Sequence, residues 1–146
     1  MQKEIKHQFT FPQPPEVVWD YLTNSELLAQ WLVPNDFKPI VGHKFQFGAQ
    51  PKLKIGFDGR IYCEVLEIIP YKKLVYSWKG GSSKEIPSLD SIVVWTLSQS
   101  EKGTVLTLEH KGFKGFKNYF AYIIMNKGWV TNSNRLFKLL EQLNHA

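Results

Sequence analysis

The side chains that could carry out chemistry in this sequence are four histidines, one cysteine and a few acids in strand-like segments. His7, His43, His110 and His145 have no metal-site spacing with one another or with Cys63. Serine, histidine and acidic residues are too dispersed for a catalytic triad, and no Gly-x-Ser-x-Gly motif is present. The sequence therefore predicts no metal site, no cofactor and no catalytic residue, which favours a protein that is not an enzyme.

Two of these residues could still act as acids or bases inside a cavity. His110 ends an apolar strand face shared with Leu106 and Leu108, which is more typical of a core histidine than of a general base. Glu64 lies at the centre of another strand-like segment, where the opposite face is the more apolar one. That pattern favours a solvent-facing Glu64 over an acid inside a cavity.

The amphipathic segment near the C-terminus is the element that must position any ligand site. Apolar residues recur at helical spacing from Trp129 to Leu143, and Met125 and Tyr122 extend the same face. Asn132 interrupts this stripe. An asparagine on an apolar helix face either contacts a ligand in a partly hydrated cavity or is a core residue hydrogen-bonded to the sheet, and the sequence leaves both interpretations open.

The segments before this helix alternate between apolar and polar residues, as strands do. Six or seven strands are predicted, at residues 3–11, 41–47, 53–57, 60–69, 74–78, 91–97 and 104–110. Two short helices are expected near the N-terminus, one over residues 14–22 and one that starts with a capping box from Thr23 to Glu26 and continues through Trp31. This order predicts an α+β fold, a curved antiparallel sheet wrapped around the long C-terminal helix. Residues 111–124 are apolar on several sides, and a lid, a helix extension and a dimer contact all remain open.

Length, charge and cysteine content narrow the class of protein. The 146 residues fit one domain, 1–146, and contain no apolar run long enough for a membrane span. The net charge of +5 comes from scattered lysines with only two arginines, which argues against nucleic acid as a partner. A single cysteine and the absence of a secretory segment favour a cytoplasmic location.

Eight short motifs follow one another in an order that resembles the Activator of Hsp90 ATPase homologue family, within the START-like (SRPBCC, Bet v 1-like) superfamily. They are Phe11-Pro12-x-Pro14-Pro15-Glu16-x-Val18-Trp19, Leu27-x-x-x-Trp31-x-x-Pro34, Val41-Gly42-x-x-Phe45-x-Phe47, Gly59-x-Ile61, Leu74-Val75-Tyr76-Ser77-Trp78, Val94-Trp95-Thr96-Leu97, Gly103-Thr104-x-Leu106-Thr107-Leu108-x-His110-x-Gly112-Phe113 and Gly128-Trp129. The resemblance implies a helix-grip fold. It also implies either a cavity for a hydrophobic ligand or a co-chaperone role, and it supplies no catalytic residues.

The prediction for function is a non-enzymatic START-like protein that binds a small hydrophobic ligand between the sheet and the C-terminal helix. The candidate lining residues share strand or helix faces that point toward this space, and each aromatic among them could equally be plain core: Trp31, Phe45, Phe47, Trp78, Trp95, His110, Trp129 and Asn132. The alternative is a co-chaperone-like module that binds a heat-shock chaperone and stimulates its ATPase. A minor alternative is an enzyme acting on a hydrophobic substrate in the same cavity. The oligomeric state stays open.

Overall fold

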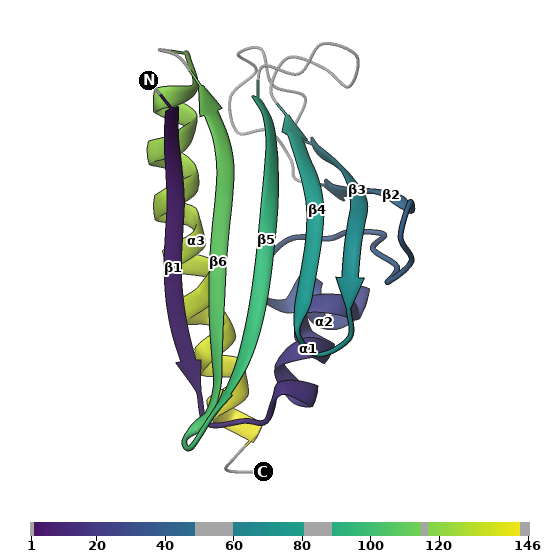
Figure 1. Cartoon of the computed structure of the whole chain (residues 1–146), viewed down its shortest axis with the longest axis vertical. Helices are drawn as coiled ribbons and strands as arrows, with labels where there is room; N and C mark the ends of the chain where they lie inside the picture. Colours follow the sequence, from purple (N-terminus) through teal and green to yellow (C-terminus); the bar gives the residue numbers. More distant parts are fainter. Residues whose placement is uncertain (1, 49–59, 81–88, 115–116, 144–146) are drawn as a thin grey trace.

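The structure is a computed structural model that describes residues 2–48, 60–80, 89–114 and 117–143. The described strands form one antiparallel sheet in the order β1-β6-β5-β4-β3-β2, and α3 runs along one face of it, behind β1 and β6 in Figure 1. The elements are β1 (Gln2–Phe11), α1 (Pro15–Thr23), α2 (Ser25–Trp31), β2 (Lys44–Gly48), β3 (Arg60–Ile69), β4 (Lys73–Gly80), β5 (Leu89–Ser100), β6 (Gly103–Lys114) and α3 (Lys117–Leu143).

The predicted α+β architecture is confirmed. Strands β3 to β6 follow one another as antiparallel neighbours, β1 returns to pair with β6, and the two short helices lie at one end of the sheet (Figure 1). Six strands are described, and the additional strand predicted at residues 53–57 lies outside the described residues. Because the sheet is curved, it forms a concave face that α3 and the short helices cover.

The junction of the two short helices differs from the prediction. The capping box at Thr23 is wrong, because Thr23 belongs to the last turn of α1, where its hydroxyl donates to the Trp19 carbonyl. Asn24 is the N-cap of α2, and its side-chain oxygen accepts from the backbone N–H groups of Glu26 and Leu27. Asparagine caps a helix as well as threonine does, so the helix starts one residue later than the Thr–Glu spacing suggests.

The predicted strand at 41–47 starts later than expected, at Lys44. Gly42 has a φ of 90°, a left-handed conformation that interrupts a strand, and Val41 is exposed. His43 therefore lies before the strand, where its ring stacks against Phe45 and its Nε2 donates to the Asp36 carbonyl. The alternation of Phe45 and Phe47 toward the core is as predicted.

Residues 111–124 divide between two elements. The first four complete β6, and α3 begins at Lys117, so the helix is extended well before Gly128. Most of the predicted stripe faces the sheet: Trp129, Leu136 and Leu140 are buried. Leu143 was predicted to lie on the same stripe, but it is 47% exposed because it is the final residue of the helix, past the point where Leu140 meets the Gln13 side chain.

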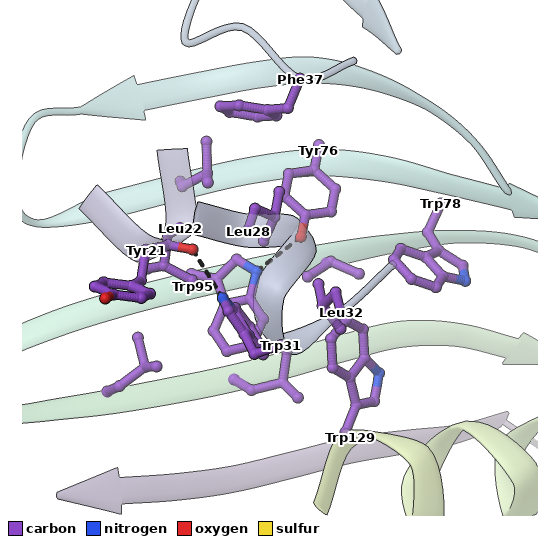
Figure 2. Close-up of a cluster of buried hydrophobic side chains, with 14 of the residues drawn as sticks. Tyr21, Leu22, Leu28, Trp31, Leu32, Phe37, Tyr76, Trp78, Trp95 and Trp129 are labelled. Carbon is purple, nitrogen blue, oxygen red and sulfur yellow. Dashed lines mark hydrogen bonds between the residues drawn. The ribbon is translucent and has the colours of Figure 1, made fainter. Parts of the chain in front are cut away.

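The core under α1 and α2 is built from large aromatic side chains, among which the indole nitrogens of Trp31 and Trp95 are both paired (Figure 2). Trp31 Nε1 donates to the Tyr21 carbonyl at 2.9 Å, and Trp95 Nε1 donates to the Tyr76 hydroxyl at 2.9 Å. The two indoles meet edge to face, with ring centroids 5.9 Å apart. Burial raises the pKa of Tyr76, so its hydroxyl stays protonated and completes this packed region.

Candidate functional site

A cavity of about 230 Å³ lies between α3 and the sheet, next to the end of α2. Its wall is almost entirely apolar and draws on β2, β3, β4, α3 and the residues that follow α2. The lining residues are Leu32, Val33, Phe47, Ile61, Trp78, Ile124, Met125, Gly128, Trp129 and Asn132. Among the described lining residues, the Asn132 amide is the only polar side-chain group apart from the indole nitrogens. Such a cavity suits an apolar ligand that carries one hydrogen-bonding group.

Gly128 contributes to the cavity by having no side chain. It lies in the interior of α3, where glycine is about 1 kcal/mol less favourable than alanine. Close packing does not require glycine here, because a Cβ added at Gly128 would meet no atom within 4 Å. The helix therefore carries a destabilising residue at a position with free space, and that space belongs to the cavity.

Asn132 lies on the cavity wall and is half-buried. Among the residues that the structure describes, its side chain has no hydrogen-bond partner. This placement bears on the two interpretations that the sequence left open, since a core asparagine would be hydrogen-bonded to the sheet. Here the amide can present both a donor and an acceptor to a ligand.

His110 is fully buried beside the cavity and links three strands to α3. Trp129 Nε1 donates to His110 Nδ1 at 3.0 Å, and His110 Nε2 lies 2.8 Å from Ser91 Oγ. The Ser91 hydroxyl in turn donates to the Trp78 carbonyl at 2.7 Å. Because an indole N–H can only donate, Nδ1 must be the acceptor and Nε2 must carry the proton.

This hydrogen-bond order decides what His110 can do chemically. Ser91 accepts from His110 and gives its own proton to the Trp78 carbonyl, whereas a catalytic serine would donate to the histidine. Burial lowers the pKa of His110 to about 3, so the ring is neutral at physiological pH. The Ser91–His110 contact is therefore part of a chain of structural hydrogen bonds that holds α3 on the sheet. This agrees with the prediction that His110 is a core histidine and not a general base.

The structure brings four of the eight predicted site residues together on the cavity wall: Phe47, Trp78, Trp129 and Asn132. The other four lie elsewhere. Trp31 and Trp95 fill the packed core under α1 and α2, and His110 lies behind Trp129 with both ring nitrogens paired. Phe45 packs against Phe37, Phe47 and Tyr76 outside the cavity wall.

Six wall residues were not among the predicted ones: Leu32, Val33, Ile61, Ile124, Met125 and Gly128. Met125 lay on the predicted helix face and Ile61 on the more apolar face of its strand, so the sequence pattern could have placed both in the cavity wall. Gly128 carried no such signal, because a glycine has no side chain that could mark a buried or an exposed helix face. Ile124 is 64% exposed and lies at the rim of the cavity.

The described residues contain no group of side chains of the metal-binding kind. No three His, Cys, Asp or Glu side chains in these segments are grouped so that they could hold a metal ion. No helix among them is long and apolar enough to cross a membrane.

Comparison with known families gives one match, which covers most of the chain. The sequence model of the family described as "Activator of Hsp90 ATPase homolog 1-like protein" matches residues 12–141. No curated protein matches the chain.

Several solved structures share the fold. Protein MLL2253 from Mesorhizobium loti is 33% identical, with a TM-score of 0.84 over 96% of this chain and 98% of that one. A Bacillus halodurans protein solved in solution is 25% identical, with a TM-score of 0.74 over 96% and 99% of the two chains. A structure described as the Aha1 dimer from Colwellia psychrerythraea is 20% identical, with a TM-score of 0.76 over 95% and 96%, and it shows likeness of fold alone.

Proposed function

This chain belongs to the Activator of Hsp90 ATPase homolog 1-like protein family, and we propose on that basis that it binds a small apolar ligand in the cavity between α3 and the sheet. The observation that carries the proposal is the combination of Gly128 and Asn132 on one wall. A glycine leaves the space open at a cost in helix stability, and an amide with no partner among the described residues lies on a wall whose other described residues are apolar apart from the indole nitrogens. Neither feature is expected of a core selected only for stability.

The size and chemistry of the cavity define the class of ligand. Its volume of about 230 Å³ is below the ~300–1,000 Å³ typical of sites for drug-sized molecules. A ligand of one or two rings, with a single carbonyl, hydroxyl or amine to meet the Asn132 amide, would fit these limits. The aromatic walls from Phe47, Trp78 and Trp129 suit a flat molecule.

The proposal is tested by filling the cavity from the position that lacks a side chain. Gly128→Leu should abolish binding of 1-aminonaphthalene, a fluorescent two-ring probe, because the new side chain occupies the ligand's space. Gly128→Ala is the matched control, since it adds one methyl group and should raise the free energy of unfolding by about 0.5–1 kcal/mol through helix propensity. Probe fluorescence titrations and urea unfolding of both variants give the two readouts.

Two results would contradict the proposal. The first is a wild-type protein that shows no saturable probe binding and retains no small molecule in native mass spectrometry after purification from its source. The second is a Gly128→Leu variant that is folded and binds the probe as the wild type does.

The family description favours a second candidate function, stimulation of a heat-shock chaperone ATPase. An exposed turn between β3 and β4 offers a contact surface for this role. Tyr71 is 49% exposed there with a φ of 65°, a left-handed conformation unusual for a bulky residue, and Lys72 next to it is exposed. Lys73 lies 3.3 Å from Glu67 and is partly neutralised by it. Lys72 is therefore the better candidate for a contact with an acidic surface.

Charge reversal separates this function from ligand binding. Lys72→Glu should weaken stimulation of a purified chaperone ATPase and leave probe binding unchanged, because encounter of charged surfaces depends on exposed charges. Lys102→Glu, in the exposed turn between β5 and β6, is the matched control. No binding to the chaperone at micromolar concentration would remove this candidate.

A further inference from the structure

The two edge strands of the sheet, β2 and β1, differ in whether another segment of the chain covers them. The outer edge of β2 is covered by the segment after α2: the Gly48 N–H donates to the Pro34 carbonyl at 2.8 Å, and the Gln46 N–H donates to the Asp36 carboxylate at 2.7 Å. Asn35 also forms a bridge to Phe47. Over the described segments, the backbone of β1 has no hydrogen-bond partner besides β6. Ten residues of β1 thus form an unpaired sheet edge, which proteins usually cover or shorten.

An apolar ridge on α3 lies beside this open edge. Ile123, Val130 and Phe137 recur every seven residues and are 46%, 38% and 42% exposed. Two contacts place the ridge on the β1 side: the His7 Nε2 donates to Asn126 Oδ1 at 2.6 Å, and the Phe137 ring lies 6.0 Å from the Phe11 ring. Figure 1 shows α3 beside β1 at this edge of the sheet. Within the described part of the chain, an unpaired strand and an exposed apolar ridge therefore share one side of the molecule.

We propose that a second copy of this chain covers this side, with β1 pairing antiparallel to β1 of the partner subunit about a two-fold axis that passes through His7. The two sheets then become one continuous twelve-stranded sheet, counting six described strands from each copy. Both α3 helices lie on the same face of it. A two-fold interface uses one surface twice, so the open edge of β1 and the ridge residues Ile123 and Val130 each meet their own copy.

The position of the axis follows from the helix and the strand together. The hydrogen bond to Asn126 fixes the level of His7 on α3, and Asn126 lies three residues after Ile123 and four before Val130. An axis at His7 therefore places Ile123 opposite Val130 of the partner subunit.

The same axis gives compatible pairs along the strand. Ile5 faces Phe9 of the partner subunit, Lys6 faces Gln8 of the partner subunit, and Glu4 faces Thr10 of the partner subunit. Pairs of a β-branched and an aromatic residue stabilise antiparallel strands, and no like charges meet. An axis at Lys6 would instead place two lysines opposite each other. An axis at Ile5 would run the pairing across the irregularity between Lys3 and Glu4 and would leave the ridge unmatched.

The distance between the two α3 helices in this arrangement also suits direct helix packing. α3 packs on both β1 and β6, so its axis lies near the boundary of these strands. With neighbouring strands about 4.8 Å apart, a β1–β1 pair places the two α3 axes roughly 10 Å apart, the distance of packed helices. Strand pairing and helix packing are thus achieved by one arrangement.

The first experiment measures the oligomeric state of the full chain by sedimentation velocity between 10 and 100 μM. We expect a dimer for the wild type and a monomer for Val130→Glu, which places two carboxylates in the helix contact. Ile92→Glu is the control, because Ile92 is similarly exposed, at 41%, but lies on β5 away from this side. Circular dichroism melts check that each variant is folded. A wild type that is monomeric throughout, or a folded Val130→Glu variant that remains dimeric, would overturn the proposal.

The second experiment tests the register with disulfides. Glu4→Cys and Thr10→Cys proteins, mixed and left to exchange, should form a covalent dimer on mild oxidation, whereas each alone should not. Glu4→Cys mixed with Gln8→Cys is the control, because that pair is displaced by two residues and exceeds the Cα separation a disulfide allows. Cys63 can stay, since it is buried and burial raises the pKa of its thiol, which keeps it unreactive. Cross-linking in the control mixture but not in the test mixture would overturn the register.

Discussion

The space between α3 and the sheet has two ends, and they are built from the same residue types with opposite results. At the end near α1, the indole nitrogens of Trp31 and Trp95 are both paired and the rings fill the space (Figure 2). At the other end, Trp78 Nε1 is buried without a partner in the described residues, the Asn132 amide is unpaired and a cavity remains. Aromatic content alone therefore does not determine whether a region is closed or open.

Trp129 joins the two ends. Its ring lies 5.5 Å from the Trp95 ring and 5.2 Å from the Trp78 ring, and its nitrogen is held by His110. The closed end can therefore stabilise the fold and hold one wall of the cavity in place, while the open end contributes less to stability. The following predictions test this division of roles.

The largest effect is expected at the closed end. Trp95→Ala should lower the free energy of unfolding by about 3–5 kcal/mol, because it leaves a large void and removes the partner of the buried Tyr76 hydroxyl. Trp78→Ala should have a smaller effect, since its ring already borders empty space. Urea unfolding of both variants gives the comparison. Equal losses would mean that the two ends contribute equally to stability.

The second effect concerns the pH dependence of stability that the buried, hydrogen-bonded His110 should cause. Burial lowers the pKa of His110 to about 3 in the folded state, against about 6.5 when unfolded. The unfolded chain therefore binds more protons between these values, and stability should fall as the pH drops below about 6.5, by up to about 1.4 kcal/mol per pH unit. Above that range His110 should contribute no pH dependence.

A variant isolates this effect from other titrating groups. His110→Gln keeps a polar side chain but cannot become protonated, so its free energy of unfolding should depend less steeply on pH between 6.5 and 4 than that of the wild type. Chemical denaturation at several pH values measures the two slopes. Parallel slopes would show that His110 is not the source of the acid sensitivity.

The fold could be predicted from the sequence because the relevant patterns are local. Alternation in the strand segments and the 3.6-residue stripe of the last helix each record which face is buried. The cavity could be predicted only in part. Trp78 and Trp95 lie on similar inward faces, and whether the space beside each is filled depends on distances between elements far apart in sequence. Gly128 shows the same limit, because the sequence does not show that the space beside this glycine is empty and belongs to a cavity.

The smallest expected change in stability, and the sharpest test of the open end, is at Asn132. Asn132→Leu should leave the free energy of unfolding unchanged or raise it, because a half-buried amide without a partner among the described residues is replaced by apolar surface worth roughly 25 cal/mol per Å² buried. The same change should alter the affinity for 1-aminonaphthalene, whose amine the wild-type amide can bind. If the amide instead has a buried partner, the substitution strands that partner and should cost about 1–3 kcal/mol with probe binding unchanged. Thermal melts and probe titrations on the same two proteins distinguish these outcomes. A loss of stability with unchanged binding would place Asn132 in the closed part of the core. The cavity end would then no longer include this residue.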